Sequence, residues 1–309
     1  MKKLLLVALG VSLSYPVRAQ KILEDLGAAQ AELIQKAQET APPPAPAPAP
    51  APKVEKASKT ELWMGSIEYA ALRVQNDWKG WDTSYVAAPG MPRDIAWVKS
   101  DEYKEQCAKT YALAWTAVSA AAKSQESDFA VVLDLDETAM DNIGYQLERN
   151  GQPFTPETWH AWVLRREATA TPSAKEFIDK VRGLGPRAHL VFITDRNSAQ
   201  QEATAENAEK IGIYKTGDLL LTKKDKTDTK DVRRKCATLG STGEDERCRA
   251  HKPVTIIAQV GDSIRDFYEI YSRAEADEKV KSIAEDKRWG SFFFILPNPM
   301  YGQWERAYK

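Results

Sequence analysis

Short apolar runs alternate with helical stretches through the second half of the chain. The runs occupy residues 129–133, 189–193, 219–221, 254–260 and 292–296. Runs of this length, separated by amphipathic helices, are typical of strands in a parallel sheet that helices cover on both faces. The pattern therefore predicts an α/β fold with a doubly wound, three-layer core.

Helical stripes precede and separate these runs. Between the first two runs, Thr171 and Pro172 have the positions of an N-cap and a first helical residue, and Gly185-Pro186 ends the helix. Two further stripes predict core-facing helices upstream: Ile67, Ala71, Val74 and Trp78 form one, and Tyr103, Cys107, Tyr111, Ala114 and Val118 form the other. Cys107 is accordingly interpreted as a buried thiol.

The N-terminus has a different texture. Lys2 and Lys3 precede ten mostly apolar residues, 4–13, and Val17-Arg18-Ala19 follows. This pattern predicts a signal peptide, residues 1–19, that is cleaved before Gln20. Ten residues are too few for a membrane-spanning helix, which needs about 20. We therefore expect an exported protein, periplasmic or extracellular, without stable membrane insertion after cleavage.

Two segments separate this signal from the folded domain. Residues 20–40 carry apolar positions at helical spacing and predict an amphipathic helix. Residues 41–53 are an Ala/Pro-rich linker, and its Ala-Pro tract, 41–52, favours extended polyproline geometry and a stiff spacer of roughly 37 Å. The helix is either an element that forms a homo-oligomer or contacts the cell envelope, or a solvated part of the spacer. The folded domain then covers residues 54–309.

Charge and cysteine usage narrow the classes of protein. The chain has 43 basic and 44 acidic side chains, so a net charge of −1 excludes binding of a nucleic acid polymer by bulk electrostatics. Cys236 and Cys248 flank a polar segment and are either free or joined by a disulfide, which an oxidising compartment would permit. A zinc site there is disfavoured, because no second Cys pair or paired His lies nearby. No cysteine near the predicted cleavage site could carry a lipid anchor.

Polar clusters follow three of the apolar runs. They are residues 134–138 (Asp-Leu-Asp-Glu-Thr), 194–196 (Thr-Asp-Arg) and 261–266 (Gly-Asp-Ser-Ile-Arg-Asp). The ligand crevice of an open parallel sheet lies outside the carboxyl ends of its strands, so these clusters should converge. Carboxylates that lie so close need a compensating cation. Oxygen ligands favour Mg²⁺, and the three histidines have no metal-binding spacing.

Asp134 and Asp136 are suited to act together in phosphoryl transfer. One carboxylate can attack phosphorus while the second carboxyl group protonates the leaving oxygen. Lys230 can supply a positive charge, because Thr227 or Thr229 as N-cap would place it in the first turn of the next helix, where backbone N–H groups also favour anions. Its neighbouring lysines are interpreted as a solvated turn.

In this order and setting, the motifs resemble those of the haloacid dehalogenase (HAD) superfamily of phosphohydrolases. More narrowly, residues 132–138 with Asp141-Asn142 and Tyr145, and the tail 296–305, resemble the bacterial class C acid phosphatases, which include outer-membrane lipoprotein 5'-nucleotidases. The resemblance covers the chain from about residue 60 to its end. It implies a Rossmann-like core with a small, mainly helical cap subdomain.

The resemblance also implies roles for individual residues. Asp134 would be the nucleophile, and Asp136 the general acid that later activates water. Thr194 and Lys230 would hold the phosphoryl oxygens. Mg²⁺ would be bound by Asp134, the backbone carbonyl of Asp136 and Asp262, with Asp266 in support.

Three further residues are assigned to the substrate. Trp159 and Tyr301 lie where the family places aromatic side chains that clamp a nucleobase, although Trp159 could instead pack within its own helical segment. Arg196 belongs to the sequence Thr-Asp-Arg, where the family more often has Ser-Asn-Arg, and this departure could alter substrate preference. The missing lipid-bearing cysteine is a second departure from the lipoprotein members.

The function expected from these features is that of an exported, Mg²⁺-dependent acid phosphatase. Its substrate would be a small phosphomonoester, with nucleoside 5'-monophosphates as candidates. A phosphotransferase that uses the same site is one alternative. A non-catalytic protein that binds phosphate or a partner on this scaffold is another, but such a protein would be expected to lack Asp134 or Asp136, and both are present.

Overall fold

The structure, a computed structural model, describes residues 66–76, 93–270 and 285–302, with the single positions 272, 274, 275, 278, 279 and 282. These residues belong to one compact unit, Lys56–Lys309. The expected signal peptide, N-terminal helix and Ala-Pro spacer lie outside the described part of the chain, as does Trp78. Of the helices that the structure describes, none has both the length and the apolar character needed to cross a membrane.

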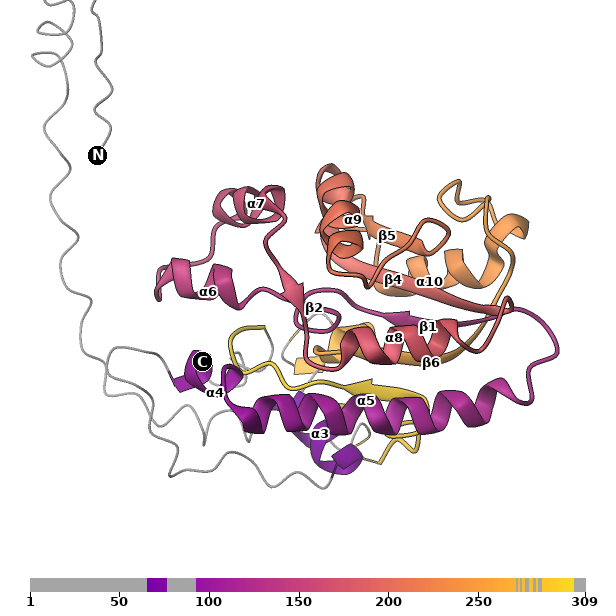
Figure 1. The fold of residues 1–309 in the computed structure, drawn as a ribbon, viewed down its shortest axis with the longest axis horizontal. Helices are drawn as coiled ribbons and strands as arrows, with labels where there is room; N and C mark the ends of the chain where they lie inside the picture. The colour runs from indigo at the N-terminus through magenta and orange to yellow at the C-terminus, as the bar shows by residue number, and fades with distance from the viewer. Residues whose placement is uncertain are drawn as a thin grey trace, which may run out of the picture. The chain divides into compact units, whose positions relative to one another are not determined.

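A five-stranded parallel sheet forms the centre of this unit, as the sequence pattern predicts (Figure 1). Its strands are, in spatial order, β5 (Leu219–Lys223), β4 (Ala188–Asn197), β1 (Phe129–Leu133), β6 (Thr255–Gly261) and β7 (Phe293–Ile295). Leu133 at the end of β1 pairs with Phe192 of β4 and Val260 of β6. The carboxyl ends of these three strands are therefore neighbours.

Each face of the sheet has its own apolar cluster. Phe129, Val131 and Leu133 of β1 pack on one side with α5 (Asp101–Ala122), α8 (Ala174–Arg182) and α9 (Gln201–Lys210). The alternate residues Ala130 and Val132 pack on the other side with α10 (Lys230–Leu239). Because successive side chains of a strand point to opposite faces, this alternation shows a three-layer core.

The helix predictions are mostly confirmed. All five residues of the Cys107 stripe are buried in α5, and Cys107 is a free, buried thiol. The stripe predicted around Val74 is partly wrong, because α3 (Ile67–Asn76) buries Ala71 and Leu72 while Val74 is 48% exposed. A short helix, α4 (Arg93–Val98), lies between α3 and α5.

Two predicted boundaries also differ from the structure. Helix α8 begins at Ala174 rather than at Pro172, because Ser173 adopts a left-handed conformation with φ of 65° and the chain first makes a turn. Strand β4 extends to Asn197, which pairs with Lys223 after a register shift. The cluster 194–196 therefore lies within the last part of the strand and not after it.

A small helical insertion leaves the core directly after β1. Its stem is a pair of short antiparallel strands, β2 (Met140–Asp141) and β3 (Thr169–Ala170). The stem carries α6 (Ile143–Arg149) and α7 (Pro156–Arg165), which Figure 1 shows standing apart from the sheet. These residues, 140–170, are the cap that the resemblance implies, and we call them the cap below.

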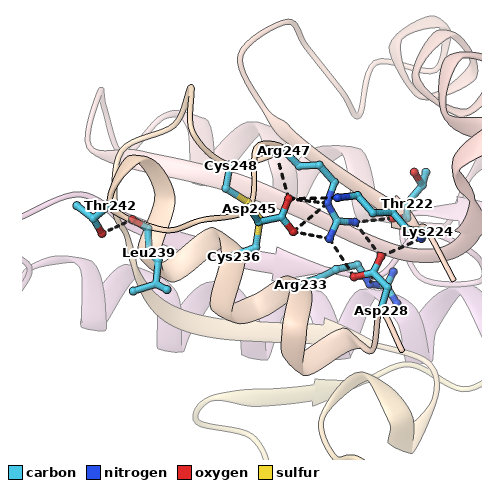
Figure 2. Close-up of a disulfide and its surroundings, with 10 residues drawn as sticks. All are labelled: Thr222, Lys224, Asp228, Arg233, Cys236, Leu239, Thr242, Asp245, Arg247 and Cys248. Atoms are coloured by element: carbon cyan, nitrogen blue, oxygen red, sulfur yellow. Dashed lines mark hydrogen bonds and ion pairs between the residues drawn. A yellow bond between two sulfur atoms is a disulfide. The ribbon is translucent and has the colours of Figure 1, made fainter. Parts of the chain in front are cut away.

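Cys236 and Cys248 form a disulfide (Figure 2). Cys236 belongs to α10, and Cys248 lies in the loop between the 3₁₀-helix Gly240–Thr242 and β6. Both side chains are buried in the cluster that α10 forms with the sheet. Of the two states that the sequence left open for these cysteines, the structure shows the bridged one.

Candidate active site

Asp134 and Lys230 form the centre of the site. Asp134 directly follows β1, and its backbone N–H donates to the carbonyl of Val260 at 2.9 Å. Lys230 is the first residue of α10, whose N-cap is Thr229. The Lys230 Nζ lies 2.5 Å from Asp134 Oδ1 and 2.5 Å from Asp266 Oδ1. The sheet and the start of α10 thus bring together charges that are almost 100 residues apart in sequence.

Three carboxylates gather at this point. One oxygen from each of Asp134, Asp262 and Asp266 lies within 4.8 Å of the others, and all three residues are buried. Asp262 accepts a hydrogen bond from Asn298 Nδ2 at 2.7 Å. The single positive charge of Lys230 cannot balance all three carboxylates once they are ionised, and the donors are all hard oxygens. This set fits a divalent cation.

Burial shapes the protonation of the cluster. Desolvation raises the pKa of Asp134 well above its usual range, although Lys230 opposes this effect. Desolvation and the nearby Asp266 carboxylate raise the pKa of Asp262 to about 8. Burial disfavours the ammonium form of Lys230, but Asp134 and Asp266 outweigh it and raise the pKa of this side chain. The neighbouring carboxylates therefore favour the positively charged form of Lys230.

Asp136 faces a different set of partners. Its Oδ1 accepts hydrogen bonds from Arg196 Nη2 at 2.7 Å, Arg196 Nε at 3.0 Å and Asn142 Nδ2 at 2.9 Å. The Thr194 hydroxyl is 3.5 Å from Asp136 Oδ2 and accepts a hydrogen bond from the Arg196 amide at 3.1 Å. The side chain of Asp136 is thus outside the carboxylate cluster. The two carboxylates that the sequence pairs have separate environments.

The cap is joined to Asp136 through Asn142. The Oδ1 atom of Asn142 accepts hydrogen bonds from Trp162 Nε1 of α7 at 2.9 Å and from Arg196 Nη2 at 3.2 Å. Arg196 also lies over the ring of Trp159, 5.4 Å from its centroid. Although it lines the cavity, Arg196 is only 2% exposed and is committed mainly to Asp136.

A cavity of about 620 Å³ lies above these groups. Its charged walls include Asp134, Asp136, Lys230, Asp262 and Asp266. Its aromatic walls are Tyr145, Phe154 and Trp159 from the cap and Tyr301 from the C-terminal segment. Trp159 packs edge-to-face against Tyr145, with 5.1 Å between ring centroids, so it both lines the cavity and packs within the cap. The structure brings every predicted site residue to this region, with Thr194 fully buried behind Asp136.

Several residues of the site had no role in the sequence-based prediction. Arg233 is fully buried, and its guanidinium donates to the backbone carbonyl of Thr194 and to Asp195. Asn298 holds Asp262, and Asn142 holds Asp136. Asn142 and Asn298 belong to the segments that resemble the family, so the resemblance could have indicated them. For Arg233 the only signal was its position on the buried face of α10.

Comparisons with known proteins identify the family of this chain. The family model described as HAD superfamily, subfamily IIIB (Acid phosphatase), matches residues 60–304. Among solved structures, the class C acid phosphatase from Bacillus anthracis is 29% identical with a TM-score of 0.58, and the match covers 70% of this chain and 86% of that one. The crystal structure of the class C acid phosphatase from Bacillus anthracis with tungstate bound matches with the same values.

The carboxylate cluster predicts a pH-dependent effect of metal on stability. Between pH 3.8 and about 8, Asp262 holds its proton only in the folded protein, so metal-free stability should fall as pH rises through this window. A divalent cation takes the place of the proton. We therefore expect saturating Mg²⁺ to raise the thermal unfolding temperature more at pH 8 than at pH 5.5.

The Asp262→Asn variant is the control for this effect, because it removes the ionisable group. It should reduce the metal-free pH dependence, to which Asp134 and Glu137 also contribute, and lose most of the Mg²⁺-induced rise. Equal Mg²⁺-induced shifts at the two pH values in the wild-type protein would contradict the interpretation of the cluster as a proton-competing cation site.

Proposed function

The chain belongs to the acid phosphatases of the HAD superfamily, subfamily IIIB, and is a phosphomonoesterase, and we propose a more specific function for it. It is an exported, Mg²⁺-dependent enzyme that hydrolyses nucleoside 5'-monophosphates among other phosphomonoesters. The observation that carries the mechanism is the pair of separate environments of Asp134 and Asp136. Asp134 lies with Lys230 among the carboxylates, whereas Asp136 is held by Arg196 and Asn142.

The proposed reaction has two displacements at phosphorus. In the first, an Asp134 oxygen attacks phosphorus, the bond to the ester oxygen breaks, and Asp136 gives a proton to that leaving oxygen. In the second, water attacks phosphorus of the aspartyl-phosphate while Asp136 takes the water proton. The bond to Asp134 breaks, inorganic phosphate leaves, and both carboxyl groups return to their first state.

The chain's own residues keep the two roles apart. Arg196 and Asn142 hold the carboxyl group of Asp136 in one orientation, apart from the carboxylates around Asp134. The Lys230 ammonium lies where the phosphoryl oxygens would arrive and stabilises their negative charge. Thr194, behind Asp136, is proposed to add a hydroxyl contact to these oxygens.

The carboxylate cluster is the proposed place of Mg²⁺. Asp134, Asp262, Asp266 and the backbone carbonyl of Asp136 would hold the ion. When bound, it supplies a positive charge that neutralises the carboxylates and the phosphoryl oxygens. Support comes from the hard-oxygen donors of the cluster. The relative from Bacillus anthracis has a structure with tungstate bound, which further supports binding of a phosphate-like anion, because tungstate and phosphate are both tetrahedral oxyanions.

The aromatic walls of the cavity support a nucleotide substrate. Trp159 of the cap and Tyr301 of the C-terminal segment line the same cavity as Lys230. A base that stacks on such side chains gains roughly 1–3 kcal/mol. The remaining cavity leaves room for a substrate that is larger than a bare phosphate.

Export is proposed from two features. The N-terminal pattern is typical of a cleaved signal peptide. The Cys236–Cys248 disulfide supports an oxidising compartment, because such bridges are rare in the reducing cytosol.

Replacing the proposed nucleophile tests the mechanism. We expect Asp134→Asn to lower phosphate release from any phosphomonoester by at least ~10³-fold, since an amide cannot form the acyl-phosphate. Release of inorganic phosphate is the assay, and thermal unfolding checks the fold. Asp101→Asn, at an exposed position of α5, is the matched control and should keep wild-type activity. Undiminished turnover by Asp134→Asn would refute the mechanism.

Replacing Trp159 tests the nucleotide preference. Trp159→Ala should lower kcat/KM for a nucleoside 5'-monophosphate by about tenfold, the equivalent of one stacked base, with little change for a small aliphatic phosphomonoester. Trp159→Phe keeps a ring and should retain most of the activity. Leu164→Ala, at an exposed position of the same helix, is the control. Equal losses on both substrates would count against stacking and favour a packing role in the cap.

A further inference from the structure

The loop before β6 places Arg247 beside the turn that leads into α10 (Figure 2). Its guanidinium donates two parallel hydrogen bonds to the carboxylate of Asp228, from Nη1 to Oδ2 at 2.8 Å and from Nη2 to Oδ1 at 2.9 Å. Nη1 also donates to the backbone carbonyl of Thr222 at 3.0 Å. The two side chains are only 16% and 5% exposed. A buried bidentate pair of this kind fixes orientation as well as distance.

Asp228 controls the turn between β5 and α10. Its Oδ2 accepts a hydrogen bond from the backbone N–H of Lys224 at 2.9 Å, which closes the turn. Asp228 is two residues before Lys230, and Thr229 between them caps the helix. The ammonium of Lys230 can reach Asp134 only if this turn sets the start of α10 at the correct place.

Arg233 extends the same network to β4. Its Nε donates to the carbonyl of Thr229 at 3.2 Å and lies 4.0 Å from Asp228 Oδ2. Its other nitrogens donate to the carbonyl of Thr194 and, at 2.8 Å, to Asp195. The network that begins at Arg247 thus reaches the backbone next to Lys230 and the backbone of Thr194. These are the two residues proposed to hold the phosphoryl oxygens.

The disulfide attaches this network to α10 itself. Cys248 directly follows Arg247, and Cys236 lies in the helix whose first residue is Lys230. Asp245 of the same loop accepts a hydrogen bond from Arg247 Nη2 at 2.6 Å and so orients the guanidinium from its other side. Figure 2 shows that the loop is connected twice to the segment 228–236. Arg247 binds Asp228 at the start of this segment, and Cys248 is bridged to Cys236 at its end.

We propose that Arg247 is a positioning residue for Lys230, and that the Cys236–Cys248 bridge holds it in that position. This inference rests on the proposed function, in which Lys230 contacts the phosphoryl oxygens. Loss of Arg247 would release the Asp228 carboxylate, loosen residues 224–230 and weaken the binding of phosphate in the cavity. A role limited to the stability of the loop would lower the unfolding temperature but leave phosphate affinity unchanged.

The first test compares two arginines of the same loop. Arg247→Ala should weaken binding of inorganic phosphate about tenfold, measured by titration calorimetry below the unfolding temperature, and should raise KM. Arg247→Lys keeps the charge without the fork and should recover only part of the affinity. Arg249→Ala is the control, because Arg249 is 57% exposed and contacts Glu244 and Glu246 of its own loop. Unchanged phosphate affinity in Arg247→Ala would overturn the proposal.

The second test asks whether the bridge acts through Arg247. The Cys236→Ala/Cys248→Ala variant should bind phosphate more weakly than the wild type, and the same pair added to Arg247→Ala should cause no further loss. Such non-additivity indicates one shared route. Additive losses in the combined variant would overturn the part of the proposal that concerns the bridge.

Hydrogen exchange separates this inference from the proposed function. Amides of residues 224–232 should exchange faster in Arg247→Ala than in Arg249→Ala, whether or not any substrate turns over. Unchanged protection there would overturn the positioning role even in a fully active enzyme. A wild-type protein that releases no phosphate from any ester would instead refute the proposed function while leaving faster exchange as evidence for the positioning contact.

Discussion

The contacts of the Lys230 ammonium with Asp134 and Asp266 are the interaction on which the site depends. Three carboxylates that are removed from water repel one another and lose hydration, both of which raise their free energy. A positive side chain at the N-terminus of a helix is also unfavourable, because the helix dipole is positive there. The positive charge of Lys230 offsets the repulsion among the carboxylates, and the carboxylates offset the unfavourable position of Lys230 at the start of the helix. The result is a site that is preorganised for an arriving anion and a divalent cation.

The topology of the sheet brings these charges together. The strand order places β1 between β4 and β6, so Asp134 lies between Thr194 and Asp262 at the carboxyl ends of these strands. The cap leaves the core a few residues after Asp134 and returns its tryptophans to Asn142 and Arg196. The cap residues proposed to contact the substrate therefore belong to the same contact network as the residues that orient Asp136.

Much of this arrangement could be predicted from the sequence. The apolar runs predict all five strands of the sheet and most of their ends to within one residue, because buried parallel strands are continuous apolar segments, whereas the polar end of β4 is missed. The carboxylates could be placed because strand ends converge. The partners of Asp136 could not be predicted, because the direction of its side chain depends on Asn142 of the cap and Arg196 of β4. Val74 and Ser173 differ from prediction because packing and a left-handed turn overrode local spacing.

Asp134 is proposed to carry the phosphoryl group during turnover, and chemical trapping tests this role most directly. Enzyme that is turning over a phosphomonoester is quenched in acid and treated with borohydride, which reduces an aspartyl-phosphate to homoserine. Peptide mass spectrometry then locates the change. We expect homoserine at position 134 only when substrate is present. Homoserine at another acidic residue, or an unmodified Asp134 in enzyme quenched during turnover, would contradict it.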